Sequence, residues 1–363
     1  MRKITAKIIL ILSLMILVTS CNTTEKISYE KYSGSFFDTF DTVTQVVGYT
    51  ETEAEFQMYY DQIQKRFQEL HKLYDIYNSY EGINNIKTIN DNAGIKPVKV
   101  DKEIIDLLLF CKEWYDVGLG KTNIAMGALL DIWHEYREQG LEDPMNAALP
   151  SEEELQEAAK HMNMDDIIID TENSTVFLAD KDMRINAGAV AKGYATEIVA
   201  QEAKAAGFSS LIISAGGNVR AMDKPLDGVR ERWGVGIQNP DMFVVVQEEN
   251  MVDTVFLTNA SVVTSGDYQR YYVVNGEVVH HLIDPATLRP ANYYRAATVI
   301  TENSGLADFL STVVFTLPYE ESRKFVENLN GVEALWIMPD GEIRATEGME
   351  KMMKSKGATG GKK

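Results

Sequence analysis

Apolar side chains in the first half of the chain recur every three or four positions, a spacing typical of amphipathic helices. The longest such run extends from Glu53 to Tyr77. Further helices are predicted over residues 101–117, 127–139 and 151–161. Before them, residues 36–49 alternate apolar and polar side chains, which predicts one strand.

After residue 166 the pattern changes to short β-branched and aromatic runs separated by turns. Strands are predicted at 167–169, 175–178, 183–185, 211–214, 233–237, 253–257, 261–264, 271–274, 278–283, 296–301 and 335–338. Helices are predicted between them at 190–206, 304–316 and 319–329. Runs of strands interrupted by a few helices predict an α+β fold, with mixed or antiparallel sheets and flanking helices.

The two ends of the chain depart from this pattern. A positively charged start precedes the apolar run Ile8–Val18, which has the length of a signal-peptide core. We therefore expect residues 1–20 to be a signal peptide, 21–35 a polar tether and 36–345 the folded domain. The Gly/Lys-rich residues 346–363 are expected to be a disordered tail.

Small residues lead from the apolar run into Cys21, and this segment resembles the lipobox of bacterial lipoproteins. The resemblance implies acylation of Cys21 and an extracytoplasmic protein held on a bacterial membrane by its lipid. An ordinary cleavage site, or an uncleaved anchor helix with an incidental cysteine, is the alternative. Cys111 is the one cysteine after Cys21. Because an acylated Cys21 cannot pair with it, no intramolecular disulfide is expected.

The charge of the chain limits its partners. The sequence holds 35 cationic and 54 anionic side chains, a formal net charge of −19. Such an acidic protein is not expected to bind nucleic acid, or to adhere to anionic lipid by charge.

The segment Asn186–Ala195 is the first with candidate chemistry. Small residues turn the chain between a strand and a helix, which leaves backbone N–H groups free for an anion. Lys192 adds a positive charge that suits phosphate. Phosphate binding and plain strand-to-helix packing both remain open. Gly216–Gly217 offers a similar choice between close approach to a ligand and a tight turn.

Two further segments carry polar groups. His280 and His281 lie near Asp284, but adjacent residues of a strand face opposite sides, which disfavours a zinc site with three ligands. Asp308 and Thr312 lie four apart on a predicted helix and share a face. Their oxygens suit a hard cation. The alternative is an exposed acid and a threonine that the helix tolerates.

Together these segments resemble the ApbE family of FAD:protein FMN transferases. The resemblance rests on Ala187–Tyr194, Gly216–Gly217, Thr264–Tyr268 followed by His281–Pro285, and Ala307–Asp308 with Thr312, in that order. It extends from about residue 36 to residue 338 and implies an ApbE-like, T-fold-like architecture with the active site in a cleft between two lobes.

The resemblance also implies roles for individual residues. It assigns Mg²⁺ to Asp308, Thr312 and the carbonyl of Ala189. It assigns FAD contacts to Phe40, Tyr80, Lys121, Thr122, Asn123, Asn186, Lys192, Gly216, Gly217 and Leu282. It makes His281, Asp284, Asp267 and Lys192 the candidate catalytic residues. Three positions depart from the family pattern: Asn123 and Asn186 replace a common aspartate, and Leu288 stands where glycine is frequent.

The activity implied is Mg²⁺-dependent transfer of the FMN half of FAD to a threonine or serine hydroxyl of an acceptor protein, with release of AMP. A redox-pump or electron-transfer subunit is the expected kind of acceptor. FAD pyrophosphatase activity is the alternative within enzymes, and a substrate-binding lipoprotein of an importer is the alternative of another class. The tail holds Gly357-Ala358-Thr359, which resembles the core of an acceptor motif, so Thr359 is a candidate for self-modification.

Overall fold

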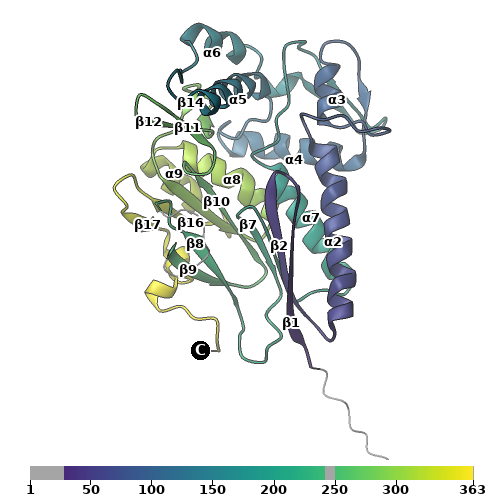
Figure 1. Cartoon of the computed structure of the whole chain (residues 1–363), viewed down its shortest axis with the longest axis vertical. Helices are drawn as coiled ribbons and strands as arrows, with labels where there is room; N and C mark the ends of the chain where they lie inside the picture. Colours follow the sequence, from purple (N-terminus) through teal and green to yellow (C-terminus); the bar gives the residue numbers. More distant parts are fainter. Residues whose placement is uncertain (1–27, 242–249, 363) are drawn as a thin grey trace, which may run out of the picture.

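An eight-stranded sheet forms the centre of the protein (Figure 1), seen in a computed structural model that describes residues 28–241 and 250–362. All its neighbouring strands are antiparallel. In sheet order they are β1 (Glu30–Thr39), β2 (Thr42–Thr50), β6 (Leu211–Ala215), β7 (Asn218–Met222), β10 (Ala260–Gly266), β15 (Ala296–Thr301), β16 (Glu333–Ile337) and β17 (Ile343–Ala345). This architecture confirms the predicted α+β class with antiparallel sheets.

Helices cover one face of the sheet and form the largest core with it (Figure 1). They are α2 (Glu53–Tyr74), α7 (Ala191–Ala205), α8 (Ser304–Thr316) and α9 (Tyr319–Glu327). Every residue of α8 except Leu306 is buried, because this helix lies between α7 and strands β10 and β15. A helix that is apolar on all sides belongs in such a position. The polar side chains on α8 therefore need partners inside the protein.

The opposite face of the sheet packs against a hairpin and the C-terminal segment, which form a second core. These elements are β8 (Trp233–Gln238), β9 (Met251–Leu257), α10 (Glu347–Glu350) and the 3₁₀ helix η3 (Lys354–Lys356). The prediction of a disordered tail is wrong for residues 346–362. Met349 and Met353 are buried in the second core, and the Phe256 N–H donates to the Met352 carbonyl at 2.9 Å. Burial of these two methionines holds the segment against the sheet, although the residues around them are rich in glycine and lysine.

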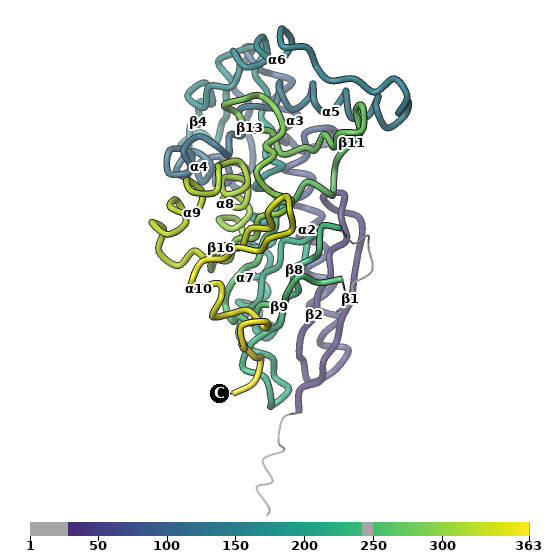
Figure 2. The backbone as a smooth tube through the Cα atoms, turned by 90° about the vertical axis from the view of Figure 1, so that its left-hand side faces the viewer, coloured from purple at the N-terminus to yellow at the C-terminus, as the bar shows by residue number. Residues whose placement is uncertain are grey.

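A smaller lobe lies above one end of the sheet (Figures 1 and 2) and has its own core. It contains α5 (Gly127–Glu142), α6 (Glu152–Ala159), β11 (Tyr271–Val274), β12 (Glu277–His280), β13 (Ile283–Asp284) and β14 (Arg289–Pro290). The capping box predicted for Ser151 and Glu154 is present at the start of α6. We call this unit the small lobe, and the eight-stranded sheet with its two covers the main lobe.

The remaining elements extend the main core beside the small lobe. They are α3 (Ile86–Asp91), α4 (Lys102–Val117), η1 (Met164–Asp166) and the three-stranded sheet of β3 (Val98–Lys99), β5 (Thr175–Leu178) and β4 (Ile167–Asp170). Residues 183–185, expected to be a strand, form only one bridge, between Arg184 and Met126.

The N-terminal prediction is also partly wrong. Strand β1 begins at Glu30, so residues 30–35 belong to the sheet and not to a tether. The single strand predicted over residues 36–49 is a hairpin that turns at Phe40 and Asp41, with φ of 54° and 51°. The segment predicted to be a signal peptide and Cys21 lie outside the described residues. Within the described ranges, no helix has the length and apolar character needed to cross a bilayer.

The anchoring of the C-terminal segment predicts a stability effect. Replacement of Met349 by alanine should lower the free energy of unfolding by about 2–4 kcal/mol, because it opens a cavity in the second core. The matched control is Met145→Ala, since Met145 is 93% exposed and its replacement should change stability by less than about 0.5 kcal/mol. Urea unfolding measures both. Equal, small effects would show that the segment does not contribute to the core.

Candidate active site

A pocket of about 370 Å³ lies between the main lobe and the small lobe. The main lobe contributes the β1–β2 turn, the start of α7, the β6–β7 turn, the end of β10 and one face of α8. The small lobe contributes α5, the strands of the β11–β12 hairpin and the loop that follows it. The volume is within the usual range for a small-molecule site, and its position between two lobes agrees with the predicted cleft.

The start of α7 and one side of α8 are in direct contact at the pocket. The Gly193 N–H donates to Asp308 Oδ2 at 2.8 Å. A Cβ atom on Gly193 would lie 2.3 Å from the carbonyl oxygen of Ser304 and 2.4 Å from Asp308 Cβ, so only glycine fits here. Gly193 is the third residue of α7, so its N–H is one of the donors that the start of a helix leaves without an intrahelical acceptor, and Asp308 satisfies it. Ala189 precedes the N-cap Val190, so its carbonyl oxygen is not needed by the helix and is available to a ligand.

Three oxygen-bearing groups predicted to hold a metal line the same pocket: the Asp308 carboxylate, the Thr312 hydroxyl and the backbone of Ala189. Asp308 Oδ1 is not used by the contact with Gly193. Burial raises the pKa of Asp308, while Lys192, the Gly193 N–H and the Asn218 amide oppose this rise. A carboxylate, a hydroxyl and a carbonyl are donors that a hard divalent cation accepts, so the residues present fit Mg²⁺.

Cations gather in the pocket although the chain as a whole is acidic. Lys121, Lys192, Arg137 and Arg270 line it, against the carboxylates of Asp41 and Asp308. Neither Lys192 nor Arg270 makes an ion pair with any residue in the described ranges, and the Lys192 ammonium contacts only the Gly188 carbonyl, at 3.3 Å. Two positive charges without protein partners make this pocket attractive to an anion such as a pyrophosphate.

His281 lies in the pocket directly after β12. Its ring Nδ1 is 3.2 Å from the Arg270 carbonyl oxygen, which can only accept, so Nδ1 carries the proton and Nε2 keeps its lone pair. Burial, together with the positive charges of Arg270 and Lys192, lowers the pKa of His281 to about 3. The imidazole is therefore neutral near pH 7. His280 is buried beside it, and its Nε2 pairs with the Asn292 side chain at 3.2 Å.

The two other predicted proton acceptors lie behind the pocket wall. Asp284 is buried, and its Oδ1 accepts from Lys121 Nζ at 2.8 Å. Asp267 Oδ2 accepts from Arg295 Nε at 2.7 Å, and burial raises the pKa of Asp267. Neither carboxylate lines the pocket. Asp284 therefore orients a lysine that does, and His281 is the one proton acceptor of the three with direct access.

Several predicted FAD contacts line the pocket: Lys121, Thr122, Asn123, Asn186, Lys192, Gly216 and Leu282. Phe40, Tyr80 and Gly217 do not line the pocket, and their predicted contact with FAD stays a prediction. Their sequence neighbours Asp41, Tyr77 and Gly216 line the pocket instead. The Phe40 ring packs against Phe67 and His71. The Tyr80 hydroxyl donates to Asp75 at 2.7 Å.

The sequence also did not identify Trp133, His134, Arg137 and Arg270 as pocket residues. The three on α5 repeat at helical spacing, but their spacing resembles that of any amphipathic face. The packing of α5 on the β11–β12 hairpin decides which face of the helix lines the pocket. This packing is a tertiary contact, so the spacing along the chain does not reveal it.

The structure shows the setting of the three departures from the family pattern and explains one of them, Asn123. Asn123 donates to the Met162 carbonyl at 2.9 Å, which an aspartate could not do. Asn186 Oδ1 accepts the Gly188 N–H at 2.9 Å, a role that either residue could fill. Leu288 adopts φ of 61°, a left-handed conformation that favours glycine.

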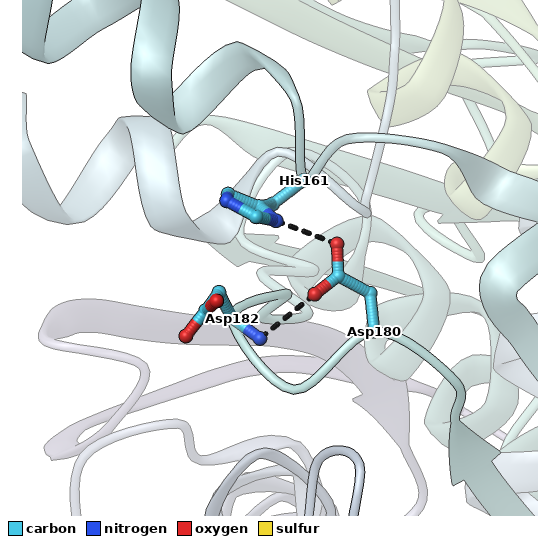
Figure 3. Close-up of side chains that lie close together, drawn as sticks. All are labelled: His161, Asp180 and Asp182. Carbon is cyan, nitrogen blue, oxygen red and sulfur yellow. Dashed lines mark hydrogen bonds and ion pairs between the residues drawn. The ribbon is translucent and has the colours of Figure 1, made fainter.

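One other group of metal-ligand side chains exists among the described residues, at His161, Asp180 and Asp182 (Figure 3). It lies outside the pocket lining. Asp180 Oδ2 pairs with His161 Nδ1 at 2.6 Å, and its Oδ1 accepts the Asp182 N–H at 2.9 Å. Both oxygens of Asp180 thus have protein partners, and the group is explained by an ion pair that closes the turn after β5.

Comparison with known proteins gives the family. The model of the ApbE family matches residues 40–336. The FAD:protein FMN transferase of Treponema pallidum is 31% identical over 276 residues, which is 73% of each chain. The ApbE protein of Thermotoga maritima has a similar crystal structure, with a TM-score of 0.76 and 26% identity over 90% of this chain and 99% of that one. The flavin transferase ApbE of Vibrio cholerae shares the fold, with a TM-score of 0.72 at 20% identity over 90% of this chain and all of that one. This chain therefore belongs to the ApbE family and is an enzyme of the transferase class.

Proposed function

We propose that this enzyme transfers the FMN half of FAD to a threonine or serine hydroxyl of an acceptor protein and releases AMP. The observation that carries the proposal is the meeting of three oxygen donors, on Asp308, Thr312 and Ala189, with the unpaired cations of Lys192 and Arg270 in one pocket. A metal site next to an anion site is what a pyrophosphate substrate requires. The relatives named FAD:protein FMN transferase support FAD as that substrate.

The metal proposed at this site is Mg²⁺, held by Asp308, Thr312 and the Ala189 carbonyl. Its contribution when bound is to neutralise charge on the pyrophosphate oxygens. Lys192 stands one turn along α7 from Gly188, at the same end of the helix as Ala189, so its ammonium can contact a phosphate oxygen. The chain thereby stabilises the negative charge that grows on the leaving phosphate of AMP.

The proposed transfer forms one bond to phosphorus and breaks one. The hydroxyl oxygen of the acceptor forms a bond to the phosphorus of the FMN half. The bond between that phosphorus and the bridging oxygen breaks, and the oxygen leaves with AMP. His281 Nε2 accepts the hydroxyl proton, since it is neutral and faces the pocket. The product is a phosphoester between FMN and the acceptor side chain.

Water could take the place of the acceptor hydroxyl, which would give FAD hydrolysis in the same site. Incubation with FAD, Mg²⁺ and a threonine-containing acceptor separates the two reactions, because only transfer leaves fluorescent flavin on the acceptor in a denaturing gel. AMP release without labelled acceptor would favour hydrolysis.

We further propose that the enzyme works outside the cytoplasm, attached to a bacterial membrane by lipid on Cys21. Strand β1 begins at Glu30, nine residues after Cys21, so the folded domain would stand close to its anchor. A membrane-bound acceptor with a domain on the same side would fit this arrangement.

Asp308→Asn should lower the rate of flavin transfer about 10²–10³-fold, because the neutral amide keeps the shape of the side chain and removes the one carboxylate of the proposed metal site. Thr312→Val should raise the Mg²⁺ concentration needed for half-maximal rate. Asp340→Asn serves as control, since Asp340 is an exposed acid that does not line the pocket. Rates come from in-gel fluorescence of the acceptor. Wild-type activity of Asp308→Asn would rule out the proposed metal site.

Binding of FAD should be linked to protonation of His281. Without ligand its pKa is about 3, and the negative pyrophosphate should raise that pKa toward the ordinary value of about 6.5. The complex then binds a proton that the free enzyme lacks, so FAD affinity should increase as the pH falls from about 7 to about 5, by at most about tenfold per pH unit. Calorimetric titration with FAD at several pH values measures this dependence. The slope should be smaller in His281→Gln, and an identical slope in both proteins would contradict the linkage.

Cys21→Ser should abolish acylation of the full-length protein. Metabolic labelling with a fatty-acid analogue in a bacterial host, followed by detergent phase partitioning, tests this. The wild type should be labelled and enter the detergent phase, and the variant should not. Equal labelling of both proteins would show that the lipid is elsewhere or that the segment is not a lipobox.

A further inference from the structure

We propose that Glu197 and Arg220, which lie outside the pocket, are positioning residues: their buried ion pair fixes α7 against α8 so that the metal-binding oxygens converge. This inference rests on the proposed function, because it concerns the proposed Mg²⁺ site. Neither residue lines the pocket, and no sequence motif singled out either one.

The pair is buried. Arg220, on β7, is 2% exposed, and its Nε lies 2.9 Å from Glu197 Oε2. The same oxygen of Glu197 accepts the backbone N–H of Ser304 at 2.7 Å. Its other oxygen accepts from the Gln201 side chain at 2.7 Å. One carboxylate therefore joins α7, β7 and the first residue of α8.

The contact between Glu197 and Ser304 joins the same two helices as the contact between Gly193 and Asp308, one helical turn away. Glu197 lies four residues after Gly193 on α7, and Ser304 lies four residues before Asp308 on α8. Each pair is one helical turn apart and shares a helix face. Gly193 meets Asp308 at the pocket, while Glu197 meets Ser304 one turn deeper.

Strand β7 also contributes one residue beside each of these two contacts. Asn218 and Arg220 are two residues apart and point to one face of the sheet. Asn218 lines the pocket as Asp308 does, and Arg220 binds Glu197. Strand β7 thus reaches both levels, through Asn218 at the pocket and through Arg220 at the ion pair.

Stability alone does not require an ion pair at this place. Removing two charges from water costs several kcal/mol, and apolar side chains of similar size often stabilise a buried position as well or better. An ion pair with directed hydrogen bonds, however, fixes position. The Ser304 N–H is one of the donors that the start of a helix leaves without an intrahelical acceptor, so Glu197 holds the axial position of α8. A displacement of about 1 Å between α7 and α8 would separate Asp308 from the Ala189 carbonyl and disturb the metal geometry.

The test compares Glu197→Gln with Glu202→Gln. Both remove one carboxylate from α7, but Glu202 pairs with Arg66 at the surface, where its side chain is 50% exposed. Titration calorimetry with Mg²⁺ in the presence of FAD, at a temperature where each protein is folded, gives the Mg²⁺ dissociation constant. Glu197→Gln should raise this constant by up to about tenfold, below the effect of losing a direct partner of a metal ligand, because Glu197 acts through the position of α7 and α8, and Glu202→Gln should leave it unchanged.

The double variant Glu197→Leu/Arg220→Met covers the case in which the single variant does not fold. It removes both charges and leaves no ion unpaired, so it should fold, while the Ser304 N–H loses its acceptor and Mg²⁺ affinity still falls. Weakened Mg²⁺ binding in a folded variant supports the positioning role. Lower thermal stability with wild-type Mg²⁺ affinity overturns it. If the wild type itself does not bind Mg²⁺, the proposed metal site is wrong and this inference fails with it. If the wild type binds Mg²⁺ and the folded variants bind it equally well, only the positioning role is wrong.

Discussion

The geometry of the pocket depends on the contact between Gly193 and Asp308. Helices α7 and α8 approach so closely there that a methyl group would collide with the Ser304 carbonyl and with Asp308 itself. The close approach lets a side chain of α8 accept a hydrogen bond from a backbone donor at the start of α7, next to the carbonyl of Ala189 that precedes the helix. A single steric constraint thus brings two of the three proposed metal ligands together from segments more than one hundred residues apart.

The charge distribution complements this geometry. The chain has a formal net charge of −19, yet four cationic side chains line the pocket. A surrounding acidic surface disfavours non-specific binding of polyanions, while the local cations attract a small one. Asp284 adds to the effect indirectly, since it orients Lys121 from behind the wall. We infer that Asp284 serves the site by placing the positive charge of Lys121, and that the chemistry at the hydroxyl belongs to His281.

Long apolar patterns and polar motifs predicted much of this protein. Helix α8 and strand β15 begin and end at the expected residues, because both are buried and strongly apolar. Asp308, Thr312 and Ala189, which helical spacing and the family resemblance suggested as metal ligands, all line the pocket. The β1–β2 turn did not, since Phe40 and Asp41 adopt positive φ without glycine or asparagine to signal it. Tyr77 and Tyr80 follow α2 in the same loop, and the spacing along the chain does not show that Tyr77 lines the pocket while the Tyr80 hydroxyl is bonded to Asp75. The ion pair of Glu197 and Arg220 could not be predicted, because its partners meet only in the folded protein.

A crystal structure with FAD and Mn²⁺, which replaces Mg²⁺ and scatters anomalously, tests the central claim most directly. The account predicts an anomalous peak within bonding distance of Asp308, Thr312 and the Ala189 carbonyl, with the FAD pyrophosphate against the ion and beside Lys192. An ion found only at His161, Asp180 and Asp182, or a pyrophosphate bound away from Asp308, would contradict it.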